Sequence, residues 1–330
     1  MREKQDEASD RRVPSPPHPL QRRAPLPGCQ PKPEVEDPSA SARVRAILNS
    51  PAYREADADI DFLASGEARG PRLELDYLKA ELQLRHNGVT DTIVVFGSTR
   101  LVEPAAARAR LQEAQCALAA RPHDAALAEK AATAQRIVLK SVYYDIARQF
   151  GALVGAAPST TSGGRLAVVT GGGPGIMEAA NRGALDAGGK SVGLNITLPH
   201  EQFPNPYVTP DLCLRFHYYA MRKMHFLLRA RALVAFPGGF GTMDELFETL
   251  TLAQTRKIAP MPIILVGEDY WRRAFDVDFL VSEGVIDPED RELFWYAETA
   301  EEIWSDILRW CAQSGNPLIE QKSSDEERSS

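Results

Sequence analysis

Three short apolar runs, at residues 92–96, 166–170 and 232–236, read as buried strands of a parallel sheet. Two of them are followed by glycines and then by apolar residues at helical spacing: Met177, Ala180, Ala184 and Leu185 after the second run, and Leu246, Leu250 and Ala253 after the third. This succession of strand, glycine turn and helix predicts an α/β fold, a Rossmann-like three-layer domain with a mostly parallel sheet.

Helical patterns also precede and interrupt these strands. Residues 41–88 carry leucines at helical spacing and predict a helical extension. Residues 103–150 are rich in alanine and predict a helical hairpin, broken at residues 121–122 and inserted before the second strand. We therefore expect one domain with helical additions.

Composition changes the picture at the two ends of the chain. The first 38 residues hold nine of the 24 prolines with scattered charges, so residues 1–40 are predicted to form a disordered tail. Their early acidic residues and missing apolar stretch argue against a signal or transit peptide. Residues 315–330 are polar and charged and predict a second disordered tail, which leaves residues 89–314 for the folded domain.

Charge and cysteine content exclude several classes of function. A net charge of −7 argues against general nucleic-acid binding, which needs a basic face. No apolar run approaches the roughly 18 residues of a membrane span, so we expect a cytoplasmic protein. The cysteines are far apart, without a C-x-x-C motif or a nearby histidine cluster, and indicate neither a zinc site nor a disulfide framework: Cys29, Cys116, Cys213 and Cys311.

Small residues follow each predicted strand: Gly97 and Ser98 after the first, GGGPG at 171–175 after the second, and PGGFG at 237–241 after the third. The carboxyl ends of parallel strands meet at one edge of a sheet, so these loops are expected to line a common crevice. Glycines let a ligand approach the backbone, and the free N–H groups of a helix's first turn favour an anion, most often phosphate.

Two nucleotide-binding motifs can be set aside. The dinucleotide fingerprint G-x-G-x-x-G fails after Gly171, because position 176 is Ile, and after Gly239, because position 244 is Asp. The run GGKS at 188–191 lies between a helix and a strand, the reverse of P-loop order, and indicates a helix stop.

Three segments carry a resemblance to a known family: GGPGIMEAAN at 172–181, RK at 222–223 and PGGFGTMDE at 237–245. They resemble the family of cytokinin-activating phosphoribohydrolases known as LONELY GUY, or LOG. Its members are often mislabelled lysine decarboxylases. The resemblance covers roughly residues 90–312 and is closer to the longer bacterial branch, which includes general nucleotide nucleosidases.

The resemblance implies hydrolysis of the N-glycosidic bond of nucleoside 5′-monophosphates, AMP or cytokinin riboside 5′-monophosphate, to free base and ribose 5-phosphate. It implies no metal or organic cofactor, and a homodimer or higher homo-oligomer.

The family's catalytic pair corresponds to Arg222 and Glu245. Cleavage of a ribosyl C–N bond passes through an oxocarbenium-like state, which a carboxylate stabilises or attacks through an activated water. Because a guanidinium hardly titrates, Arg222 is expected to orient Glu245 or the substrate. Without the resemblance, Arg222 would read as a surface cation on a basic helix. Residues 236–245, taken alone, could equally form a tight turn with a solvated acidic helix start.

Substrate-binding candidates come from the loops and the resemblance: Gly97, Ser98, Gly172, Gly173, Gly175, Met177, Glu178, Lys223, Gly238, Gly239, Gly241, Thr242 and Asp244. Glu178 and Asn181 stand one turn apart on a helix and could reach the nucleotide or serve solubility alone. Arg100 is a weaker candidate for binding the phosphate. Residues 200–205 form a weaker candidate for a loop that covers the base.

Two other functions stay open. A non-catalytic nucleotide or molybdenum-cofactor carrier of the same fold would need the glycine loops but neither Arg222 nor Glu245. Lysine decarboxylase itself would need a lysine that forms a Schiff base with pyridoxal phosphate, and no lysine lies in a recognisable site of that kind.

Overall fold

The computed structural model describes residues 14–199 and 203–319, in two units that meet in sequence at Arg69 and Gly70. In the first unit, residues 14–39 contain no helix or strand and are almost wholly exposed. They are followed by α1 (Ala40–Leu48), a 3-10 turn η1 (Pro51–Tyr53) and α2 (Ile60–Ala64). The outer parts of both predicted tails, 1–13 and 320–330, lie outside the described residues.

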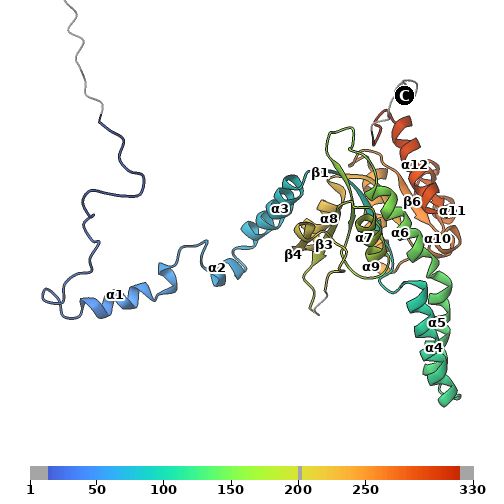
Figure 1. The fold of residues 1–330 in the computed structure, drawn as a ribbon, viewed down its shortest axis with the longest axis horizontal. Coiled ribbons are helices and arrows are strands. Elements are labelled where there is room, and N and C mark those ends of the chain that lie inside the picture. Colours follow the sequence, from blue (N-terminus) through green and yellow to red (C-terminus); the bar gives the residue numbers. More distant parts are fainter. Residues whose placement is uncertain (1–13, 200–202, 320–330) are drawn as a thin grey trace, which may run out of the picture. The chain divides into compact units, whose positions relative to one another are not determined.

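The second unit is built on seven parallel strands, which confirms the predicted α/β fold class (Figure 1). They are β1 (Val89–Phe96), β2 (Arg165–Thr170), β3 (Ser191–Ile196), β4 (Cys213–Phe216), β5 (Ala230–Ala235), β6 (Ile263–Val266) and β7 (Trp295–Ala297). The three strands predicted from apolar runs are β1, β2 and β5, which lie next to one another at the centre of the sheet.

The strand order, β4-β3-β2-β1-β5-β6-β7, shows where the chain reverses direction across the sheet. From β1 the chain proceeds outward through β2 and β3 to β4, then returns to β5 on the other side of β1. Ligands of open parallel sheets bind outside the carboxyl ends of the strands at such a reversal. The fold therefore favours a site at the ends of β1 and β5.

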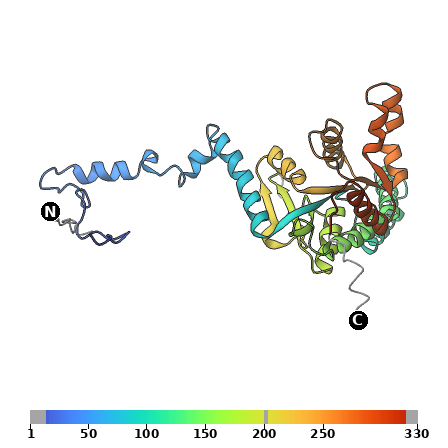
Figure 2. The same cartoon turned by 90° about the horizontal axis from the view of Figure 1, so that it is seen from above.

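Helices cover both faces of this sheet (Figures 1 and 2). Within β1, Ile93 and Val95 pack on one face, and Val94 and Phe96 on the other. The first face is covered by α6 (Val142–Gly155), α7 (Ile176–Asp186) and α12 (Ala300–Gln313), and the second by α3 (Arg69–His86), α8 (Tyr219–Leu227), α9 (Phe240–Gln254) and α10 (Glu268–Ala274). Three short elements complete the unit: η2 (Pro210–Leu212), α11 (Val277–Ser282) and η3 (Pro288–Leu293).

The alanine-rich insertion forms α4 (Pro104–Ala120) and α5 (Ala125–Lys140), which turn at the predicted break. The predicted hairpin was too long, however, because residues 142–150 belong to α6. The side chains of Tyr144 and Phe150 are fully buried against the sheet, so α6 is a layer of the core. The sequence pattern could not show this, because one helical periodicity continues from the insertion into the core helix.

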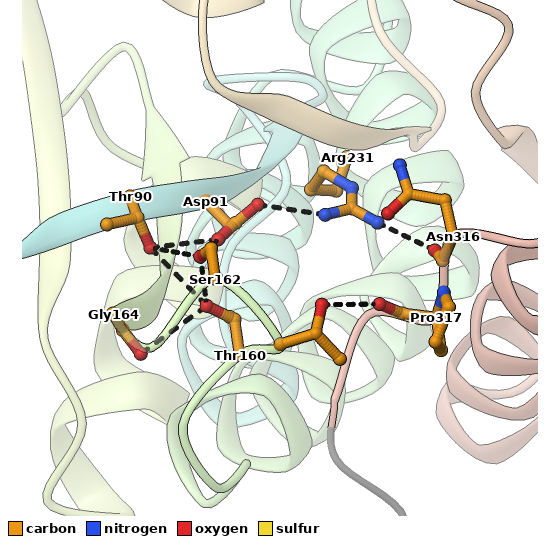
Figure 3. A network of polar contacts seen from close by, with 9 residues as sticks. Thr90, Asp91, Thr160, Ser162, Gly164, Arg231, Asn316 and Pro317 are labelled. Carbon is orange, nitrogen blue, oxygen red and sulfur yellow. Dashed lines mark hydrogen bonds and ion pairs between the residues drawn. The ribbon is translucent and has the colours of Figure 1, made fainter.

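A polar network joins the starting ends of the central strands to the end of the described chain (Figure 3). The buried Asp91 of β1 accepts hydrogen bonds from Ser162 at 2.6 Å and from Thr90 at 2.8 Å. It also forms an ion pair with Arg231 of β5 at 3.0 Å, and Arg231 donates a hydrogen bond to the carbonyl of Asn316 at 2.8 Å. The network stabilises the edge of the sheet opposite the glycine loops.

Candidate active site

A cavity of about 610 Å³ lies at the carboxyl ends of the central strands, lined by the small-residue loops that follow β1, β2 and β5. These loops are joined by backbone hydrogen bonds. The Ser98 N–H donates to the Pro237 carbonyl at 2.9 Å, and the Ile176 N–H donates to the Ser98 carbonyl at 3.1 Å. The strand order thus brings together segments that are more than 130 residues apart in the chain.

Two glycines are required by the close approach of these loops. Gly175 has a φ of 76°, a backbone conformation that residues with a side chain rarely adopt. A Cβ at this position would lie 2.3 Å from the Ser98 carbonyl oxygen. A Cβ on Gly238 would lie 2.1 Å from the Thr242 hydroxyl oxygen. Both distances are far below van der Waals contact, so each glycine fixes the shape of its loop.

Asparagine side chains hold the loop after β2 through hydrogen bonds. The Asn205 side chain donates to the Gly173 carbonyl at 3.0 Å and to Asn181 Oδ1 at 2.9 Å, and Asn195 donates to the Gly171 carbonyl at 3.0 Å. Asn181 is fully buried. The expectation that Asn181 or Asn205 reaches the nucleotide is therefore replaced by a supporting role beneath the loop, and the neighbouring candidates 200–202 lie outside the described residues.

Arg222 and Glu245 meet at the cavity, brought there by α8 and α9. Arg222 Nη2 lies 3.7 Å from Glu245 Oε1, and the two side chains are only 15% and 6% exposed. The guanidinium also lies over the rings of Tyr219 and Phe226, 4.8 and 5.7 Å from their centroids. Arg222 is thus a largely buried, oriented cation rather than a solvated surface residue.

Lys223, the next residue of α8, binds a group of carboxylates. Its Nζ lies 2.8 Å from Asp244, 3.2 Å from Glu245 Oε2 and 2.8 Å from Glu248. Burial disfavours the lysine's charge, but hydrogen bonds to Asp244 and Glu248, and the charge of Glu245, raise the pKa of Lys223 above its ordinary value. Lys223 and Asp244 are outside the cavity lining, so this cluster holds Glu245 in place from behind.

The environment of Glu245 suits a base. Burial raises the pKa of its carboxyl group, while Lys223 and Arg222 oppose the shift and Glu248 adds to it. A carboxylate whose pKa is raised is a stronger base than an ordinary surface glutamate and accepts a proton more readily.

The structure places ten of the predicted site residues in the cavity lining: Gly97, Ser98, Gly173, Met177, Arg222, Gly238, Gly239, Gly241, Thr242 and Glu245. Five are outside it: Gly172, Gly175, Glu178, Lys223 and Asp244. Glu178 accepts a hydrogen bond from the Tyr144 hydroxyl at 2.9 Å. Burial is the main reason why the pKa of Tyr144 is raised, and this hydrogen bond adds to the shift.

Several residues that line the cavity were not predicted from the sequence: Lys140, Asn195, Tyr219, Phe240 and Tyr270. Tyr219 and Phe240 are close to the recognised motifs and could have been inferred from them. The other three come from α5, β3 and α10, and no local pattern marks them.

The described part of the chain lacks two features that would indicate other functions. It contains no cluster of three or more His, Cys, Asp or Glu side chains arranged to hold a metal ion. Its helices include none that combines the length and apolar character needed to cross a membrane.

Known proteins resemble part of this chain, including the segment that carries Arg222 and Glu245. A family model described as "Possible lysine decarboxylase" matches residues 177–307. The probable cytokinin riboside 5′-monophosphate phosphoribohydrolase LOGL5 of Oryza sativa subsp. japonica is 32% identical over 140 residues, 41% of this chain and 55% of that protein. The resemblance to the LOG family is confirmed.

A second LOG protein, cytokinin riboside 5′-monophosphate phosphoribohydrolase LOG3 of Arabidopsis thaliana, is 38% identical over 84 residues, 25% of this chain and 39% of its own length. The matches thus span about half or less of these curated LOG relatives. Among solved structures, a molybdenum cofactor carrier protein from Chlamydomonas reinhardtii superimposes with a TM-score of 0.40 at 18% identity, covering 68% of this chain and 99% of that one.

Proposed function

We propose that the chain hydrolyses the N-glycosidic bond of nucleoside 5′-monophosphates, such as AMP or cytokinin riboside 5′-monophosphate, to free base and ribose 5-phosphate. The observation that carries this proposal is the buried pair of Arg222 and Glu245 beside two glycine loops. A binding protein would need the loops alone, because a buried carboxylate next to a phosphate site disfavours binding unless chemistry uses it.

The charge of the cavity supports an anionic substrate. Among the described lining residues, three cations, Arg100, Lys140 and Arg222, face one carboxylate, Glu245. The lining is thus positive by two charges in a protein whose net charge is −7. A phosphate monoester carries about −1.5 to −2 charges at pH 7 and would balance this excess.

The geometry supports the following assignment of roles. The phosphate binds at the start of α9, where backbone N–H groups and the helix dipole favour an anion. Glu245, one turn further along α9, then accepts a proton from the water that attacks C1′. The C–N bond breaks with its electron pair on the base. The base then takes up the proton that Glu245 removed from the water, which returns Glu245 to its carboxylate form, and Arg222 orients Glu245 and the ribose.

A comparison of AMP with adenosine tests the proposal. Products are resolved by chromatography across a panel of nucleosides and nucleotides, which also reveals the preferred base. Each charge-assisted hydrogen bond contributes about 1.5–3 kcal/mol, so loss of several phosphate contacts should reduce kcat/KM for adenosine by orders of magnitude. Equal rates on the two compounds would contradict the phosphate assignment, and binding of AMP without turnover would favour a carrier.

We further propose that residues 89–314 form the hydrolase domain of a cytoplasmic homodimer or higher homo-oligomer. Apolar side chains exposed on α8 and α9 support an assembly, among them Met224 at 37% and Phe240 at 96% exposure. Light scattering at micromolar concentration should report more than one chain per particle, and a monomer alone would contradict the assembly.

A further inference from the structure

Lys140, the last residue of α5, contributes a cation to the cavity from the helical insertion. Its Nζ lies 5.6 Å from the centroid of the Tyr270 ring. The Tyr270 hydroxyl in turn donates a hydrogen bond to the carbonyl of Gly238, in the loop that leads into α9. Lys140 therefore lies on the side of the cavity where the proposed phosphate site begins.

The charge of Lys140 is not matched by a carboxylate within the described residues, where no ion pair of this lysine is found. The other cations near the site differ from it: Arg222 is paired with Glu245, and Lys223 with three carboxylates. A half-buried lysine at a cavity wall, held by an aromatic ring rather than by an acid, keeps its capacity to bind an anion.

Lys223 would be the obvious lysine for phosphate from the sequence motif, but its surroundings argue against that role. All three of its short contacts are to carboxylates, and it does not line the cavity. A phosphate would have to displace those partners and approach their negative charge. Lys140 faces no such obstacle.

We propose that Lys140 is a specificity-determining residue that binds the substrate's 5′-phosphate against the start of α9. This inference rests on the proposed function, because it names the side-chain partner of the same phosphate group. It also gives the insertion a role, since Lys140 ends α5 and lines a cavity built on the core sheet. An ammonium point charge suits a phosphate dianion, whose oxygens accept from several directions.

The test compares Lys140→Met with Lys130→Met, a matched change at an exposed position of the same helix. Lys140→Met should raise KM for AMP roughly tenfold to a hundredfold, as expected for one charge-assisted hydrogen bond, with little change in kcat. The weak reaction with adenosine should stay within about twofold of the parent, because no phosphate is present. Lys140→Arg should recover most of the affinity, and Lys130→Met should behave as the parent. Equal losses on AMP and adenosine, or unchanged KM, would overturn the inference.

Calorimetric binding of ribose 5-phosphate, with ribose as the control ligand, tests the lysine without requiring turnover. The parent should bind ribose 5-phosphate, and Lys140→Met should bind it at least about tenfold more weakly. If the parent hydrolyses no nucleotide but shows this dependence, the proposed function fails and the inference on Lys140 stands. If the parent hydrolyses AMP but both proteins bind ribose 5-phosphate equally, or neither binds it, the inference fails and the proposed function stands.

Discussion

Replacing Glu245 by Gln separates catalysis from folding in this site. The carboxylate lies 3.2 Å from Lys223 and 3.7 Å from Arg222, and its burial raises its pKa, so its charge is kept at some cost in free energy. The amide keeps the shape and removes that cost, while Lys223 keeps its contacts with Asp244 and Glu248. Arg222, however, loses its carboxylate partner, so we expect the free energy of unfolding to fall, by about 3 kcal/mol at most because Arg222 keeps its contacts with the rings of Tyr219 and Phe226.

The effect on the reaction should be much larger. A group that accepts a proton in the transition state contributes about 10²- to 10⁴-fold to the rate, which corresponds to roughly 2.7–5.4 kcal/mol of activation free energy. Because this interaction forms mainly in the transition state, kcat and kcat/KM should fall together. The dissociation constant for AMP should stay close to the parental value.

Single-turnover kinetics on AMP, calorimetric binding and thermal unfolding measure these three quantities. Glu248→Gln is the matched control, because Glu248 also lies 2.8 Å from Lys223 but does not line the cavity. Glu248 acts on Glu245 only through Lys223 and through its charge, so its change to Gln should reduce activity by far less than Glu245→Gln does. Hydrolysis of AMP by Glu245→Gln at the parental rate would exclude Glu245 as the base. An equal loss of activity in Glu248→Gln would show that the loss does not depend on a direct role of Glu245.

Three further substitutions test the roles of Arg222, Gly238 and His225. Arg222→Ala should reduce kcat/KM for AMP by about 10² or more and also weaken binding, because the guanidinium orients both substrate and carboxylate; unchanged binding and rate by calorimetry and kinetics would oppose this role. Gly238→Ala should weaken ribose 5-phosphate binding in calorimetry, since its Cβ would lie 2.1 Å from the Thr242 hydroxyl; parental affinity would show that the loop is not the phosphate site. Burial lowers the pKa of His225, so the unfolded chain binds more protons than the folded one as the pH falls through about 6.5 and below. Stability measured by urea unfolding should accordingly decrease from pH 7.5 to pH 5.5, and His225→Phe should reduce this dependence; an identical pH profile in that variant would contradict the assignment.

The central strands were predictable because their burial on both faces leaves continuous apolar runs in the sequence. The short strands β6 and β7 were not, since four and three residues carry too little pattern to separate from a helix or loop. The strand order, which decides which loops meet, depends on long-range pairing that local periodicity does not encode.

The same distinction holds for the site. Arg222 and Glu245 were proposed from the sequence because the RK and PGGFGTMDE segments resemble the LOG family, and without that resemblance Arg222 looks like a surface cation. Lys140 and Tyr270 reach the cavity from α5 and α10, and each looks like an ordinary surface residue in its own segment. Lys223 shows the reverse case, because its motif suggested a substrate contact whereas its three carboxylate partners point to support of Glu245.

In the proposed reaction, the bond between ribose and base breaks while the phosphate stays on the ribose. The most direct measurement uses the full chain in excess over AMP labelled in both the base and the ribose, and separates the products after a single turnover. The parent should release one equivalent each of adenine and ribose 5-phosphate, and Glu245→Gln should release neither above background. Recovery of intact, bound AMP from the parent, or release of adenosine and inorganic phosphate, would contradict it.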